Sequence, residues 1–237
     1  MFKNIFPNKI LLLSNKTINK LIFLFILVLT IGIIYSLFLS PPDYIQGDAA
    51  RIMYVHVPAS ILALVCFGLI GIASISNLVF KIRFLSLLSK SLAPIGCIFS
   101  IISIVTGSLW GKPTWGTWWV WDARLTSMFI LFLFYLFYIF TWKFINDFNR
   151  ANKITSIIAI IGLFNLPIIK YSVNWWSTLH QPSSLTLTSA PSIHYSMLIP
   201  LLIMFFTMLM FLLIIFLMKY KTEVMKFKID KKKIISK

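Results

Sequence analysis

The apolar residues of this chain fall into long continuous blocks, separated by short polar or aromatic segments. Each block is close to the ~20 residues that an α-helix needs to cross a bilayer. A β-barrel is disfavoured because its strands would alternate apolar and polar residues over about ten positions. The pattern predicts an all-α membrane protein, with one six-helix domain over residues 1–237. The expected spans are approximately 21–39, 57–79, 91–109, 125–142, 154–169 and 196–218.

The length and flanking residues of the first block distinguish a membrane span from a cleaved signal peptide. Its apolar run of about 19 residues exceeds the ~7–15 residues of a signal-peptide core. The chain then continues Leu39-Ser40-Pro41-Pro42, with no A-x-A-like cleavage site. We therefore expect an uncleaved first span.

Composition agrees with a membrane protein and gives it an orientation. The chain is 59% hydrophobic and 12% charged, too few charges to cover a soluble domain of this size. Under the six-span arrangement, 18 of the 22 Lys and Arg residues fall on the side that carries both termini. The positive-inside rule therefore predicts that both termini are cytoplasmic.

The net charge of +16 raises the question of a nucleic-acid partner. Nucleic-acid binding would favour aromatic residues interleaved with the lysines, and the basic termini contain few. We expect no nucleic acid, and membrane lipids instead: the basic cytoplasmic tail over 219–237 would lie against anionic head groups.

The opposite, outer side holds all three histidines and seven of the eight tryptophans. Five tryptophans fall within the twelve residues 110–121. An aromatic belt would be spread over both sides of the membrane, whereas this cluster is contiguous. If residues 115–122 are helical, one stripe of that helix holds Trp115, Trp118, Trp119 and Asp122. Such a helix could lie flat on the membrane as an aromatic floor for a large planar ligand.

Two of the histidines flank this loop in the predicted topology. His56 precedes Pro58, where the second span is expected to begin at the outer boundary. His180 follows a second Trp-Trp pair in the last outer loop. His194 lies near the start of the sixth span and is interpreted as a helix-end residue outside the site.

Haem suits two imidazoles beside an aromatic floor, because imidazole is a common axial ligand and the macrocycle is planar and apolar. Arg51 and Arg124 are the candidate partners for its propionates. Asp122 could contact the ligand or pair with Arg124. Zinc fits less well, because Cys66 and Cys97 lie inside spans and leave two histidines without further ligands.

The tryptophan segment, with the residues around both histidines, resembles a known family signature. It reads WGKPTWGTWWVWDARLTS over residues 110–127 and is similar to the "WWD" signature of haem-handling proteins in cytochrome c maturation. Among these, the chain most resembles the haem exporter protein C (CcmC) family. The resemblance covers most of the chain and includes YVHVPA at 54–59, NLPII at 165–169, YSV at 171–173, WW at 175–176 and TLHQ at 178–181.

The resemblance implies a non-enzymatic assembly factor that binds haem b on the outer, periplasmic face. His56 and His180 would be the axial ligands to the haem iron. The residues expected around the haem are Trp115, Trp118, Trp119, Trp121, Asp122, Arg51 and Arg124. The implied partners are the haem chaperone CcmE, which would receive the haem, the ABC transporter CcmA/CcmB and the small subunit CcmD. The family occurs in bacterial and mitochondrial inner membranes.

Three alternatives compete with this interpretation. Haem lyase or synthetase components of the superfamily are longer and carry additional intramembrane histidines. A permease would place polar residues or broken helices near the membrane midplane, where this chain has almost no ionisable residue. A structural membrane subunit would use its tryptophans only as anchors.

Overall fold

All regular elements in the described part of the chain are helical. The computed structural model describes residues 15–176, 178–180 and 192–235. Six segments are long and apolar enough to cross a membrane, which confirms the predicted all-α, six-helix membrane fold. The helices are α2 (Asn15–Ile34), α3 (Met53–Phe80), α4 (Arg83–Trp115), α5 (Ala123–Phe144), α6 (Phe148–Leu163), α7 (Asn165–Trp175) and α8 (Tyr195–Ile235).

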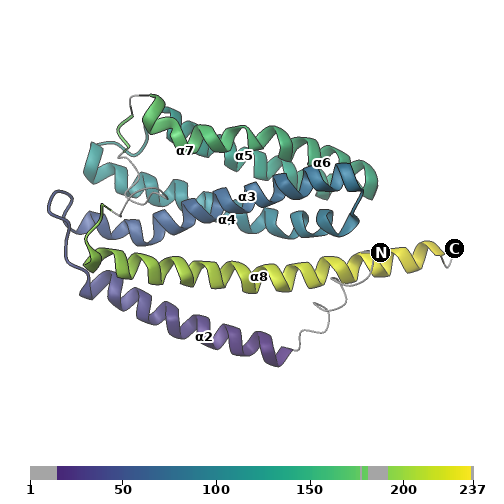
Figure 1. The fold of residues 1–237 in the computed structure, drawn as a ribbon, viewed down its shortest axis with the longest axis horizontal. Helices are drawn as coiled ribbons and strands as arrows, with labels where there is room; N and C mark the ends of the chain where they lie inside the picture. Colours follow the sequence, from purple (N-terminus) through teal and green to yellow (C-terminus); the bar gives the residue numbers. More distant parts are fainter. Residues whose placement is uncertain (1–14, 177, 181–191, 236–237) are drawn as a thin grey trace.

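The antiparallel pair α3 and α4 forms the centre of the bundle (Figure 1). Helices α5, α6 and α7 pack on one side of this pair, and α8 packs on the other side with α2 against its outer surface. Small residues allow close approach in the centre: Gly96 of α4 faces Tyr135, whose hydroxyl donates to the Ala63 carbonyl oxygen at 2.6 Å. Tyr135 is fully buried, so this bond ties α5 to α3 inside the core.

The two ends of the bundle differ in composition, and we name them accordingly. The tryptophan end, at the left of Figure 1, comprises residues 35–56, 107–124, 171–176, 178–180 and 192–197. The basic end, at the right, holds the start of α2, the 81–90 and 143–153 segments and α8 from Lys219 onward. The first and last described helices therefore begin and end at the basic end.

The helix boundaries around the tryptophan loop differ from those expected. A 3₁₀ turn, η2 (Asp48–Ile52), leads into α3 at Met53, so His56 lies inside the helix and Pro58 does not start it. Helix α4 continues to Trp115 and ends at Gly116, whose φ of 78° is in the left-handed region.

The proposed flat aromatic helix over 115–122 is wrong, because residues 116–122 are non-helical. The Thr117 hydroxyl donates to the Trp119 carbonyl oxygen at 3.1 Å and closes a turn there. Asp122 then caps α5, its Oδ1 accepting from the Leu125 N–H at 2.7 Å. Local side-chain bonds of this kind compete with continued helix.

Two further helices are longer than the apolar blocks indicated. Helix α7 extends to Trp175, six residues past the expected end of the fifth span. Helix α8 continues to Ile235 through the segment expected to be a tail. Its basic part is held to α4 by the Lys90–Glu223 ion pair at 2.7 Å and by Tyr220 packed against Leu87.

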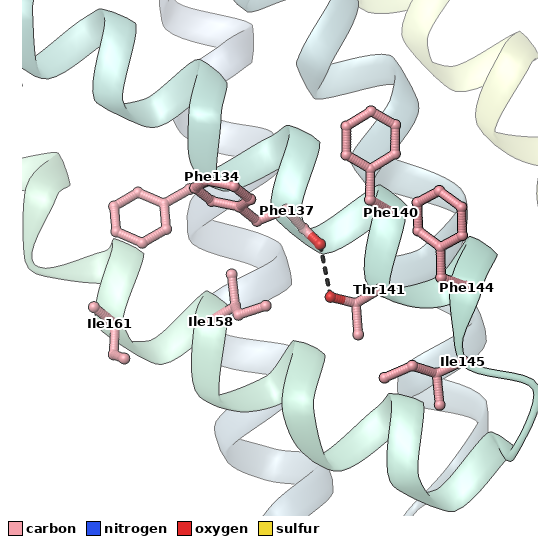
Figure 2. Close-up of a pocket in the computed structure, with 8 residues that line it drawn as sticks. All are labelled: Phe134, Phe137, Phe140, Thr141, Phe144, Ile145, Ile158 and Ile161. Carbon is pink, nitrogen blue, oxygen red and sulfur yellow. Dashed lines mark hydrogen bonds between the residues drawn. The ribbon is translucent and has the colours of Figure 1, made fainter.

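A separate hollow of about 430 Å³ lies between α5 and α6 (Figure 2). Its walls are phenylalanine and isoleucine side chains, and the Thr141 hydroxyl within it donates to the Phe137 carbonyl oxygen at 2.7 Å. The hollow therefore presents no free polar group that could ligate a metal. It is not a candidate for the predicted haem site.

Candidate functional site at the tryptophan end

A cavity of about 280 Å³ opens at the tryptophan end between α3, α4, α5 and α7. This volume is just below the range of about 300–1,000 Å³ that is typical of small-molecule pockets. Both predicted ligand histidines line it. The polar and aromatic members of its wall are Gln46, His56, Ser60, Ser103, Ser108, Trp110, Thr114, Trp115, Trp119, Arg124, Lys170 and His180.

Helix α4 fixes the orientation of the His56 ring. The ring Nδ1 lies 3.1 Å from the Ser103 carbonyl oxygen and 3.1 Å from the Thr106 hydroxyl oxygen. A carbonyl oxygen can only accept, and Thr106 itself donates to the Ile102 carbonyl oxygen. The proton of a neutral His56 therefore belongs on Nδ1, which leaves Nε2 with a free lone pair. This backbone bond is the usual outer contact of a metal-binding histidine.

His180 reaches the same cavity from the segment that follows α7. The Thr178 hydroxyl accepts from the His180 backbone N–H at 3.0 Å, and the imidazole packs against Trp115 with ring centroids 5.1 Å apart. Burial, with Arg124 and His56 nearby, lowers the pKa of His180 to about 3, so the ring is neutral at physiological pH. Its Nδ1 is buried without a hydrogen-bond partner among the described residues. A ligand group bonded at Nδ1 would remove that cost.

The two imidazoles lie at a separation that suits one metal ion between them. Their ring centroids are 6.4 Å apart. Histidine nitrogens bind metal ions at about 2.0–2.1 Å, so two rings on opposite sides of one ion have centroids roughly 6 Å apart. Within the described residues, no group of three or more His, Cys, Asp and Glu side chains could hold a metal. The available donor set is thus a pair of imidazoles, which suits a metal with other in-plane ligands.

A tight turn over residues 43–47 places Gln46 in hydrogen-bonding contact with Trp110 at the cavity wall. The Asp43 Oδ1 accepts from the backbone N–H groups of Ile45 and Gln46, and Gly47 closes the loop with φ 56°. Gln46 Oε1 then accepts from Trp110 Nε1 at 2.8 Å. Trp110 packs edge-on against His56, with ring centroids 5.8 Å apart.

The chain is similar to known proteins over most of its length. The profile of the family described as heme exporter protein C, CcmC, matches residues 2–235. The chain belongs to the CcmC family. It is 43% identical over 204 residues to the heme exporter protein C of Haemophilus influenzae, covering 86% of this chain and 83% of that protein.

Similar proteins of the CcmC family occur in bacteria and in a plant. The heme exporter protein C of Bradyrhizobium diazoefficiens is 39% identical over 220 residues, which cover 93% of this chain and 83% of the relative. A ccmC-like mitochondrial protein of cytochrome c biosynthesis from Marchantia polymorpha is 42% identical over 201 residues, 85% of each chain.

The residues assigned through the CcmC resemblance fall into two groups. Trp115, Trp119 and Arg124 line the cavity together with both histidines. Trp118 and Trp121 are exposed, at 54% and 74%, and do not line it. Asp122 is also outside the lining and caps α5.

Arg51 lies apart from the cavity, in the loop that joins α2 to α3. Its guanidinium donates to the carbonyl oxygens of Leu37 and Ser40, and it pairs with Asp48 at 3.2 Å. Arg51 therefore clamps the π-helical turn η1 (Tyr35–Leu39) at the end of α2 to η2.

Sequence reasoning missed several residues of the wall. Gln46, Trp110 and Lys170 were not assigned to the site, and Ser103 and Thr106 were not recognised as partners of His56. Only the position of Trp110 within the signature could have indicated it. His194 is exposed, and its Nδ1 is within 2.8 Å of the Ser196 hydroxyl at the start of α8, as expected of a helix-end residue.

Proposed function

We propose that this protein binds haem b in the cavity at the tryptophan end and passes it to the haem chaperone CcmE during cytochrome c maturation. His56 and His180 are the axial ligands in this proposal. Trp115 and Trp119 contact the macrocycle, and the chain carries out no bond chemistry of its own. The relatives named heme exporter protein C support this class of cargo.

The observation that carries the proposal is the 6.4 Å between the ring centroids of His56 and His180, which line the same cavity. The Ser103 contact directs the free lone pair of His56 away from α4. A porphyrin supplies the in-plane nitrogens that a two-histidine site lacks. The cavity is small, so an edge of a bound haem would extend beyond it, beside the exposed rings of Trp118 and Trp121.

This open edge provides a route for transfer. An acceptor that docks on the exposed tryptophans could reach the haem without a helix having to move. Axial ligation through two histidines has to be strong enough to load haem and still exchangeable. The non-helical segment 117–121 is the part of the loop that would move during exchange.

The distribution of basic residues supports an orientation with the basic end in the cytoplasm or its equivalent. The tryptophan end would then face the periplasm, or the intermembrane space in a mitochondrion. We assign the protein to an inner membrane as a partner of the CcmA/CcmB transporter and the CcmD subunit.

A spectroscopic experiment tests the proposal directly. The chain is expressed without other maturation proteins and purified in mild detergent, and its visible spectrum is recorded oxidised and reduced. A low-spin bis-histidine Soret band is expected, weakened in both His56→Ala and His180→Ala. His194→Ala is the matched control and should keep the wild-type band. No haem band in the wild type, under conditions that load a control haem protein, would favour a structural subunit.

A further inference from the structure

The cavity wall carries positive charge that is not balanced by acids within it. Two cationic side chains line the cavity, Arg124 from α5 and Lys170 from α7. Among the described residues, no Asp or Glu lines it. With both histidines neutral, the wall therefore has two formal positive charges, which favours an anionic ligand.

Acids at this end of the bundle take part in local interactions. Asp48 pairs with Arg51 at 3.2 Å, and Asp43 accepts from two backbone N–H groups of its own turn. Asp122 caps α5 through its Oδ1, and its charge acts on the neighbouring Arg124. Lys170 is therefore the lining cation that forms no ion pair with a described acid.

Lys170 reaches the cavity because α7 is longer than the apolar pattern indicated. The helix carries Lys170 one position after Ile169, which is buried and also lines the cavity. Lys170 is an exposed side chain, and it forms no ion pair with any described residue. Its ammonium is therefore available to a ligand at the open side of the cavity.

Trp119 adds a neutral donor to the same wall. Its indole Nε1–H is buried and has no acceptor within the described part of the chain. Indole N–H is a donor only, so what is missing there is an acceptor. Two cations and an unpaired N–H donor in one cavity share a preference for carboxylate oxygens.

We infer that Lys170, together with Arg124 and the Trp119 N–H, forms a carboxylate-binding wall that holds the propionates of haem. Lys170 takes the role that sequence analysis gave to Arg51, whose guanidinium is occupied by Leu37, Ser40 and Asp48. This inference rests on the proposed haem function and specifies which cations select the cargo.

The test compares two iron porphyrins that differ only in these carboxylates. Purified protein in detergent is titrated with haem and with haem dimethyl ester, and Kd is taken from the Soret change. Lys170→Gln should weaken haem binding about two- to fivefold, the range for an exposed ion pair, and leave ester binding unchanged. Lys170→Glu should weaken haem further and the ester little. The low-spin spectrum should persist in both variants.

Lys112→Gln is the matched control at the same end of the bundle. Lys112 is outside the cavity, with its ammonium donating to the Gly116 carbonyl oxygen and lying 5.9 Å from the Trp118 ring centre. It should bind haem and the ester like the wild type. Equal losses for haem and ester in the Lys170 variants, or no loss for haem, would overturn the inference while leaving the haem function standing. A wild type that binds neither porphyrin through two histidines would overturn both.

Discussion

Gly107 of α4 offers a way to disturb His56 without removing its imidazole. A Cβ added at Gly107 would lie 3.0 Å from His56 Cε1 and 3.5 Å from Nδ1. Ordinary contact begins at 3.4 Å, so Gly107→Ala requires the ring to move by a few tenths of an ångström. The Nδ1 bond to the Ser103 carbonyl oxygen, 3.1 Å long, would then stretch towards the limit of a hydrogen bond.

Loss of an outer contact to a metal-bound histidine typically lowers metal affinity 10–100-fold. We expect Gly107→Ala to raise the Kd for haem by about tenfold, or about 1.4 kcal/mol. Haem titration of the purified protein, followed at the Soret band, measures this change. Thermal stability should not fall in parallel, since replacing a helical Gly by Ala contributes about 0.5–1 kcal/mol of stability.

Gly68→Ala is the control for the backbone effect. Gly68 lies in α3, and an added Cβ there would meet only Leu166 Cδ1 at an ordinary 3.7 Å. This variant should gain similar helix stability and keep the wild-type haem affinity. Wild-type affinity and an unchanged low-spin spectrum in Gly107→Ala would refute the role given to the orientation of His56.

Three further predictions concern protonation, core packing and the α2–α3 junction. Because the pKa of about 3 keeps His180 unprotonated in the folded protein, the low-spin Soret band should persist from pH 7 to 5 in an acid titration. Loss of half of the band near pH 6.5, the pKa of an exposed imidazole, would contradict this. Because unfolded His180 takes up a proton below about pH 6.5, apo-protein stability should fall as the pH drops from there towards 3. Gly96→Ala would place a Cβ 2.1 Å from the Tyr135 hydroxyl oxygen and should cost about 2–4 kcal/mol, seen as a lower midpoint of thermal unfolding that Gly68→Ala does not share. Arg51→Gln should destabilise the fold by about 1–3 kcal/mol, also seen as a lower midpoint of thermal unfolding, and should change the affinities for haem and its dimethyl ester equally.

Hydropathy was sufficient to predict the spans, because a bilayer imposes one length and one polarity on each helix. Hydropathy did not predict where the helices begin and end. Lys90 lies inside α4 and pairs with Glu223 of α8, a contact between residues far apart in sequence. The extension of α7 past residue 169 places Lys170 in a helix, where the hydropathy pattern gives no signal.

The two candidate ligand histidines could be predicted from the sequence, but their separation could not. His56 and His180 are brought together by the packing of α3, α4, α5 and α7, which no local pattern encodes. The aromatic stripe failed for a local reason: the Thr117 turn and the Asp122 cap interrupt the helix that its spacing assumed. Nothing in the sequence indicates that the Arg51 guanidinium donates to the carbonyl oxygens of Leu37 and Ser40.

Helix α8 has a mechanical consequence for the bundle. Its 41 residues correspond to a rod of roughly 60 Å at 1.5 Å per residue, about twice the thickness of a hydrocarbon core. Near one end, Met197 and Leu201 pack in a cluster with Met53, one turn before His56; near the other, Glu223 is bonded to α4. Pro200 is the one proline inside this helix, so the rod is continuous from there to the basic end. A load applied to its extension at the basic end would be carried along the whole bundle to the packing beneath His56.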